Sequence, residues 1–250
     1  MMRGHGFSLI EMAFVLVIVT LLLGGLLVPF ATQVEQRRIT ETQKGMEEIK
    51  EALIGFALSH VSGNPSRPYL PCPDTDNNGE ENFDLASGLC TNEEGLLPWV
   101  TLGLGNQDAW GNRFFYRVTG EFANRAPAAN PGFNLDSSGN LRICSRSPTL
   151  PAALCNPIAS AIPAVVISFG KNSRGAMNIN NAVANPAPAG ADERENSGAG
   201  AATDFVSRVL TAPSVPCDGA GEALCEFDDL VVWLSPNILF NRMVAAGKLP

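Results

Sequence analysis

Residues 12–31 read MAFVLVIVTLLLGGLLVPFA and contain no charged side chain. A helix of this length rises about 30 Å, which matches the hydrocarbon core of a membrane. A cleaved secretory signal has a shorter apolar region followed by small residues, and residues 28–32 (VPFAT) match that pattern poorly. We therefore expect residues 7–31 to form a single membrane-spanning helix, with a cleaved signal as the alternative.

The segment after the apolar run is predicted to continue the helix. Residues 32–61 contain no proline, and their apolar side chains recur at intervals of three, four and seven residues. The turn-forming residues 62–65 (SGNP) end the pattern. The sequence thus predicts one long N-terminal helix with a membrane half, 7–31, and an amphipathic half, 32–61. The simpler alternative is a single-pass anchor followed by a stalk helix.

A carboxylate stands at the start of the apolar run, where residues 6–11 read GFSLIE. A charge at this position is costly unless it is paired or lies at the membrane surface. One interpretation places Glu11 among the lipid headgroups near a helix N-terminus, where the helix dipole favours an anion.

The combination of GFSLIE, a short leader containing Arg3 and a following apolar helix resembles the processing motif of type IV prepilins and pseudopilins. The resemblance implies that residues 1–6 are a leader, which a prepilin peptidase removes between Gly6 and Phe7. It also implies N-methylation of Phe7 and an ion pair between Glu11 and the Phe7 amine of a neighbouring subunit. Such a pair lowers the cost of burying either charge.

The remaining residues, 62–250, are predicted to form a small α+β head with an antiparallel β-sheet. Short β-branched and aromatic runs between Gly, Asn and Pro turns mark the strands. The candidate strands are Arg113–Thr119, Leu141–Cys144, Ala164–Phe169, Asp204–Leu210 and Asp229–Leu234. A short helix is expected at Asn237–Ala246, and the Ala/Gly/Pro/Asn-rich segment 182–203 is expected to be a long mobile loop.

Three stretches of the head are similar to the major pseudopilin of type II secretion, in the same order. They are DAWGN at 108–112, SFGKN at 168–172 and DDLVVW at 228–233. This resemblance implies an enlarged pseudopilin-like head and a structural Ca²⁺ ion held by Ser168, Asn172, Asp228 and Asp229. Asn172 stands where the family has an acid, which weakens that ligand set.

A second candidate for Ca²⁺ is the segment DTDNNG at 74–79. Asp74, Asp76 and Asn78 stand at positions 1, 3 and 5 of a calcium loop, with Gly79 at position 6. The Glu of position 12 is missing, because Leu85 stands there. The alternative interpretation is a solvated turn rich in Asp and Asn.

Six cysteines follow the apolar run, which is typical of an oxidising compartment. Six cysteines allow 15 pairings, and pairing them in sequence order would staple three short Gly/Pro-rich loops. We therefore expect structural disulfides in the long loops of the head. The cysteines are Cys72, Cys90, Cys144, Cys155, Cys217 and Cys225.

The charge and histidine content exclude several classes of protein. A net charge of −8 at pH 7 argues against nucleic-acid binding through a broad basic surface. Only two histidines are present, and the sequence contains no nucleotide-binding or nucleophile-elbow motif. An enzyme is therefore not expected.

Together these features predict a structural subunit, and a minor one, of a type IV pilus-like or type II secretion pseudopilus filament. Its partners would be prepilin peptidase, other pilin or pseudopilin subunits, the inner membrane, and a secreted substrate or surface. The expected location is the bacterial inner membrane, crossed once, with the head in the periplasm. The alternative is a membrane-anchored periplasmic binding module that does not polymerise, and a DNA-uptake filament is a further variant of the first interpretation.

Overall fold

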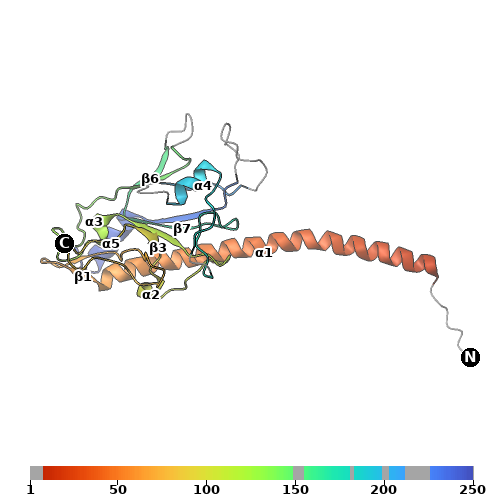
Figure 1. Cartoon of the computed structure of the whole chain (residues 1–250), viewed down its shortest axis with the longest axis horizontal. Coiled ribbons are helices and arrows are strands. Elements are labelled where there is room, and N and C mark those ends of the chain that lie inside the picture. The colour runs from red at the N-terminus through yellow and green to blue at the C-terminus, as the bar shows by residue number, and fades with distance from the viewer. Residues whose placement is uncertain (1–7, 149–154, 181–182, 199–202, 212–225, 250) are drawn as a thin grey trace, which may run out of the picture. The chain divides into compact units, whose positions relative to one another are not determined.

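A computed structural model describes the chain except residues 1–7, 149–154, 181–182, 199–202, 212–225 and 250, and the side chains of 23–29. The chain divides into two compact units, Met1–Glu41 and Thr42–Pro250. Helix α1, Leu9–Ser59, begins in the first unit and ends in the second (Figure 1). Each unit is described by itself below.

In the first unit, the described residues form the N-terminal part of α1. They do not bear out the expected membrane span. Within the described residues, no helix combines the length and the apolar character needed to cross a membrane. This finding contradicts the predicted single-pass location in the inner membrane.

In the second unit, the last turns of α1 pack into the head. Met46, Ile49, Leu53 and Ala57 are buried, and their spacing of three and four residues places them along one side of the helix. The Thr42 hydroxyl oxygen accepts a hydrogen bond from the backbone N–H of Ala109 at 3.2 Å. The amphipathic pattern thus matches the buried side of the helix here.

The larger sheet of the head has four strands in the order β3-β4-β7-β9, and every neighbouring pair is antiparallel. The strands are β3 (Glu94–Leu96), β4 (Phe115–Val118), β7 (Ala164–Ser168) and β9 (Leu230–Leu234). All five residues of β7 are buried, because the sheet is covered on both faces. The predicted α+β class with an antiparallel sheet is confirmed.

A second sheet has the order β6-β5-β8, formed by β5 (Leu141–Cys144), β6 (Pro157–Ile162) and β8 (Asp204–Val206). The β5–β8 pair is parallel, a pairing that the predicted antiparallel sheet did not include. A parallel pair needs a long crossover, and the chain between residues 144 and 204 provides it. One apolar cluster includes residues from both sheets: Leu141, Ile143, Ile162, Val165, Ile167, Phe169, Ala176 and Phe205.

The remaining elements are short. A two-stranded ribbon joins β1 (Val61–Ser62) and β2 (Arg67–Pro68), and single turns form α2 (Trp99–Leu102) and α3 (Gly120–Ala123). Helix α5, Pro236–Ala245, buries Leu239 and Met243. The last turns of α1 and helix α5 lie on one side of the large sheet, while β6 and helix α4 (Ala191–Asn196) lie on the other (Figure 1).

The segment predicted to be a mobile loop, 182–203, contains helix α4 (Ala191–Asn196). Asp192 is buried and its carboxylate binds the Arg208 side chain at 2.7 Å and the backbone N–H of Ser147 at 2.8 Å. These bonds satisfy a charge that would otherwise be costly to bury. The prediction of a loop over this whole segment is therefore wrong for α4.

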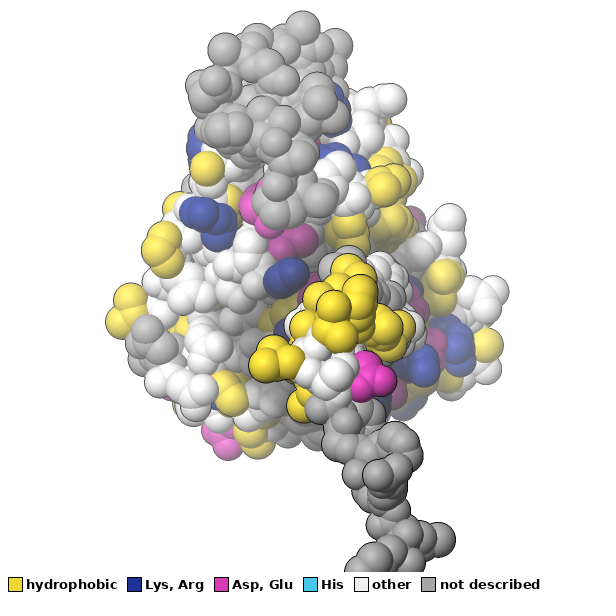
Figure 2. Space-filling view, turned by 90° about the vertical axis from the view of Figure 1, so that its right-hand side faces the viewer, with side chains coloured by type: hydrophobic (Ala, Val, Ile, Leu, Met, Phe, Trp, Pro, Cys, Tyr) yellow, Lys and Arg dark blue, Asp and Glu magenta, His cyan; other side chains and the backbone are white. Residues whose placement is uncertain are grey.

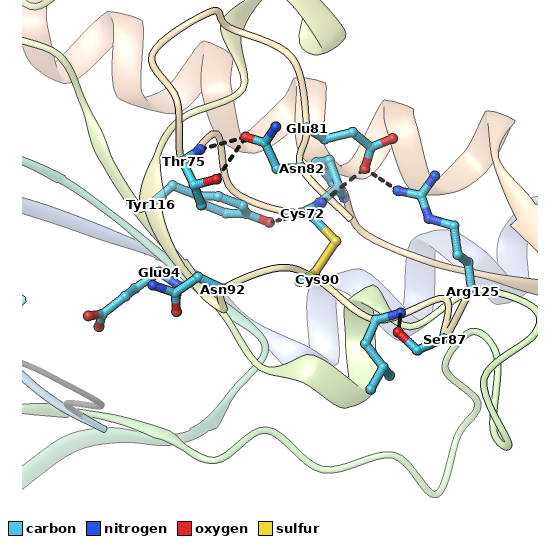
Figure 3. The surroundings of a disulfide bond; sticks show 12 residues. Cys72, Thr75, Glu81, Asn82, Ser87, Cys90, Asn92, Glu94, Tyr116 and Arg125 are labelled. Atoms are coloured by element: carbon cyan, nitrogen blue, oxygen red, sulfur yellow. Dashed lines mark hydrogen bonds and ion pairs between the residues drawn. A yellow bond between two sulfur atoms is a disulfide. The ribbon is translucent and has the colours of Figure 1, made fainter. Parts of the chain in front are cut away.

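Two disulfides staple loops of the head, as expected. Cys72 is bonded to Cys90, and Cys144 is bonded to Cys155. Near the first bond, Glu81 accepts a hydrogen bond from the Cys72 backbone N–H and pairs with Arg125 (Figure 3). Cys217 and Cys225 lie outside the described residues.

Candidate functional site

The first candidate site is the start of α1. Gly6 and Phe7, the predicted processing residues, lie outside the described residues. Ser8 precedes the helix, and its backbone N–H donates to the Glu11 carboxylate at 2.8 Å, while the Glu11 N–H donates to the Ser8 hydroxyl at 3.3 Å. This reciprocal pair is a capping box, which satisfies two N–H groups that the first helical turn leaves unpaired.

The capping box gives Glu11 a local role that the sequence analysis missed. Its signal, Ser followed three residues later by Glu, is visible in the sequence at 8–11. The backbone and hydroxyl hydrogen bonds from Ser8 lower the pKa of Glu11 below its ordinary value. Glu11 is therefore a carboxylate that keeps its charge at neutral pH.

Around and after Glu11, the described part of α1 carries large apolar side chains that are exposed. Leu9 is 90% exposed and Phe14 is 64% exposed. The same surface continues through further large apolar side chains up to Leu22. Figure 2 shows hydrophobic side chains gathered on this face of the molecule.

The second candidate site is built by the three motif stretches of the head, of which the first two meet at Asp108. The Ser168 hydroxyl donates to Asp108 at 2.7 Å, and the backbone N–H groups of Trp110 and Asn112 donate to the other carboxylate oxygen at 2.9 Å. Burial raises the pKa of Asp108 in spite of these bonds. The hydroxyl of Ser168, one of the predicted Ca²⁺ ligands, therefore donates its hydrogen bond to Asp108.

The second and third stretches meet at Gly170 and Asp228. The backbone N–H of Asn172 donates to the Asp228 carboxylate at 2.7 Å. Gly170 has a φ of +57°, and a Cβ atom there would lie 2.2 Å from the Asp228 carbonyl oxygen. Only glycine has both the conformation and the space for this approach.

Three carboxylates converge beside this contact. One ligand oxygen from each of Glu193, Asp228 and Asp229 lies within 4.8 Å of the other two. Glu193 accepts hydrogen bonds from the Asn172 side chain at 3.0 Å and the Asp228 N–H at 3.2 Å. Asp229 accepts one from the Asn196 side chain at 2.9 Å. Of the predicted ligands, Asn172, Asp228 and Asp229 are therefore brought together.

Glu193 belongs to this cluster although it was not among the predicted ligands. It lies on α4, in the segment that the sequence analysis expected to be a loop. The only signal was the charged group at 192–195 within an otherwise uncharged stretch. Its place beside Asp228 depends on the packing of α4, which periodicity does not reveal.

The electrostatics of the cluster are those of carboxyls with little access to water. Burial raises the pKa of Asp228 to about 7, and the negative charges of Glu193 and Glu226 act in the same direction. Burial also raises the pKa of Glu193 and, more strongly, that of Asp229. Either a proton or a cation would relieve this repulsion.

The donor set fits Ca²⁺. The Oδ1 atom of Asp228 is buried and has no hydrogen-bond partner among the described residues. Ca²⁺ binds carboxylate and carbonyl oxygens in flexible geometry. Asp228, Asp229 and Glu193 are the residues that would hold the ion, which would offset two of their three negative charges and join the residues just before β9 to α4.

In the other predicted calcium loop, the oxygens bind the loop's own backbone. Asp74 accepts hydrogen bonds from the N–H groups of Asp76, Asn77 and Gly79 at 3.1, 2.8 and 2.9 Å. Asp76 accepts one from the Asn78 N–H at 3.3 Å. These bonds are those of a turn stabilised by Asp and Asn side chains.

Comparison of the chain with protein-family models, with curated protein sequences and with solved structures finds no match.

Proposed function

We propose that the chain is a structural subunit, and a minor one, of a type IV pilus-like or type II secretion pseudopilus filament. The proposal includes processing by a prepilin peptidase between Gly6 and Phe7. The observation that carries it is the uncovered apolar surface of α1 directly after the carboxylate of Glu11.

The apolar surface supports assembly through helix packing. Large apolar side chains from Leu9 to Leu22 are exposed in the single chain. Removing an apolar surface of this kind from water lowers the free energy, and exposed apolar patches mark interaction sites. In the proposed filament, the same helices of neighbouring subunits cover one another. The long helix then has two parts, one in the filament core and one, Thr42–Ser59, that carries the head.

In this proposal, the charge of Glu11 sets the axial displacement between neighbouring subunits of the filament. Removal of residues 1–6 would create a positive amine on Phe7, four residues before Glu11. Within one helix this amine lies at the same end as the capping box, so a neighbouring subunit displaced along the filament brings its own amine to Glu11. An opposite charge in a low-dielectric surrounding is strongly attracted, which fixes one displacement over others.

The head then faces outward, toward a secreted substrate or a surface. As part of the proposal, a Ca²⁺ ion at Glu193, Asp228 and Asp229 braces it. These residues come from β9 and α4 and their neighbouring turns, which are far apart in sequence. A bound ion would hold these segments together without a catalytic step.

The test separates the charge of Glu11 from its capping role. Glu11→Gln keeps a side chain that can complete a capping box but removes the charge. The matched control is Glu41→Gln, which removes a charge from an exposed position of the same helix. Each full chain is produced together with a prepilin peptidase, the mass of its N-terminal peptide is measured, and filaments are quantified by sedimentation and electron microscopy.

We expect the wild-type chain and Glu41→Gln to begin at Phe7 and to sediment as filaments. Glu11→Gln should also begin at Phe7 but stay unassembled. A wild-type chain that keeps residues 1–6 would refute the processing step. Assembly of Glu11→Gln at the wild-type level would refute the role of the charge and would favour a binding module that does not polymerise.

A further inference from the structure

The two sheets of the head have four edge strands, and the chain itself closes two of these edges. At β3, the backbone N–H and C=O of Leu96 bond to the backbone of Asp74 at 2.8 and 2.9 Å. At β8, the Val206 N–H donates to the Asn196 side chain at 2.7 Å, and the Asn196 amide donates to the Val206 carbonyl at 3.0 Å. Groups of the same chain therefore occupy both edges.

The edge at β6 is irregular. It begins with Pro157, which has no N–H to offer, and its register against β5 shifts twice. Ala161 has a φ of +57°, which interrupts the extended backbone. Proline and bulges are devices that keep an edge strand from pairing with another chain. The edge at β6 is therefore protected as well.

The edge at β9 has none of these features. Its five residues, LVVWL at 230–234, include no proline, glycine or charged residue, and their register against β7 is continuous. Every second residue of an edge strand turns its N–H and C=O away from the sheet. Among the described residues, no group bonds to the backbone of β9 on that side. A regular, apolar and unpaired edge is a template for another strand.

The side chains of β9 add apolar surface at this edge. Val231, Val232 and Trp233 are half-buried, so part of each side chain is open to a partner. Tryptophan is frequent among the residues that contribute most to binding, because its large ring combines apolar area with an N–H donor. The edge thus offers both backbone hydrogen bonds and apolar contacts.

We propose that the edge of β9 binds an extended, uncharged apolar segment of another protein by antiparallel strand addition, and that a basic residue follows this segment. Backbone hydrogen bonds of the added strand supply the affinity, and contacts with Val231 and Trp233 supply the selectivity. An antiparallel strand ends beside the start of β9, which Glu226 and Asp228, both half-buried, precede in the chain. A Lys or Arg at that end of the segment complements these negative charges.

A second copy of the chain fits this edge less well. Two copies of one edge pair antiparallel around a two-fold axis, which makes the two chains run in opposite directions. This step rests on the proposed function, because the α1 helices of the proposed filament run in the same direction. The same proposed function turns the head toward a secreted substrate, which would supply the segment.

The test uses the full chain, a chelator and the peptide acetyl-AVVISK-amide. The first five residues of this peptide repeat β7, which pairs with β9 antiparallel, so in the same register its lysine stands opposite Asp229. Binding is measured by NMR titration and located by amide hydrogen exchange. We expect saturable binding and at least about tenfold slower exchange at alternating residues of β9, with the exchange at β3, β6 and β8 unchanged.

Two control peptides test the chemistry of the segment. In acetyl-AVPPSK-amide, two adjacent prolines remove one N–H of each orientation, and this peptide should bind at least about tenfold more weakly. In acetyl-AVVISE-amide, a negative charge replaces the positive one, and the binding should be at least about threefold weaker.

Two variants test the place of binding. Val231→Lys puts on β9 a charge of the kind that protects natural edge strands, and it should weaken the binding at least about tenfold. The matched control Ile158→Lys puts the same charge on the edge at β6, where Ile158 is 53% exposed, and should change the binding less than about threefold.

Four outcomes would overturn the proposal. They are the absence of saturable binding of acetyl-AVVISK-amide, equal binding of the proline peptide, slower exchange at another edge instead of β9, and dimerisation of the free chain through β9, which would assign the edge to a second copy. If Val231→Lys does not fold, the exchange map decides. Processing and filament assembly are not part of these measurements, so a chain that assembles but does not bind the peptide refutes only this proposal.

Discussion

The carboxyl groups of Glu193, Asp228 and Asp229 should make the metal-free head less stable as the pH rises. Burial raises the pKa of Asp228 from 3.8 to about 7, so the folded state holds this proton where the unfolded state has lost it. When the folded state binds more protons, stability falls as pH rises. The contribution of the protonated form is complete below pH 3.8 and is lost as the pH approaches about 7.

The size of the effect follows from the pKa difference. A change from 3.8 to about 7 corresponds to an upper bound of roughly 4 kcal/mol in the free energy of unfolding. Asp229 and Glu193 also have raised pKa values, so their ionisation acts in the same direction. Groups with lowered pKa values, such as Asp84, act in the opposite direction. The difference in the free energy of unfolding between two variants, followed against pH, therefore reports on these carboxyl groups better than the pH profile of one protein.

The assay compares wild type with Asp228→Asn by urea unfolding with a chelator present, between pH 5 and 8. The amide stays neutral, so the unfolding free energy of the variant should rise relative to that of the wild type as pH rises, by up to roughly 2.5 kcal/mol across this pH range. The control Asp136→Asn changes an exposed aspartate and should follow the wild type. Parallel profiles for wild type and Asp228→Asn would refute the reasoning.

Calcium should reverse this dependence, because the ion replaces the proton as the partner of the ionised carboxylates. At pH 8, millimolar Ca²⁺ should raise the unfolding midpoint of the wild-type chain and of Asp136→Asn, but change that of Asp228→Asn less. An unchanged wild-type midpoint would remove the ion from the proposal and leave the filament subunit standing.

Three further changes test the elements that position these sites. Ser8→Ala removes the cap of α1 and should cost about 1 kcal/mol of local helix stability, seen as faster amide exchange in its first turn. Replacing both Cys72 and Cys90 with serine should lower the free energy of unfolding by about 3 kcal/mol in urea, and equal stability would show that the closed loop adds nothing. Gly170→Ala should lower it by at least about 1 kcal/mol, because the new Cβ meets the Asp228 backbone at a positive φ. A stable Gly170→Ala would mean that this approach is looser than described.

The local patterns in the chain predicted the elements that depend on neighbours in sequence. The β-branched runs at 164–169 and 229–234 form the paired strands β7 and β9, because strand propensity depends on a few consecutive residues. The disulfides Cys72–Cys90 and Cys144–Cys155 close the short loops that their spacing suggested. The apolar run at 12–31 predicted a membrane span, and no described helix provides one. Composition alone was therefore not sufficient to predict this feature.

The candidate sites depend on contacts that no local pattern contains. The antiparallel register that pairs Ser168 with Leu230 brings Asp228 to Gly170, and the packing of α4 then adds Glu193 to the cluster. Which sheet edge stays open likewise depends on the bonds of Asp74 and Asn196 that close β3 and β8. The sequence by itself determined strands β4, β5, β7, β8 and β9, the amphipathic end of α1 and the loop staples, because these follow from periodicity and spacing, whereas it did not reveal β3 or β6. Only the tertiary structure decided which carboxylates share one low-dielectric region, because burial and charge repulsion arise between segments that packing brings together.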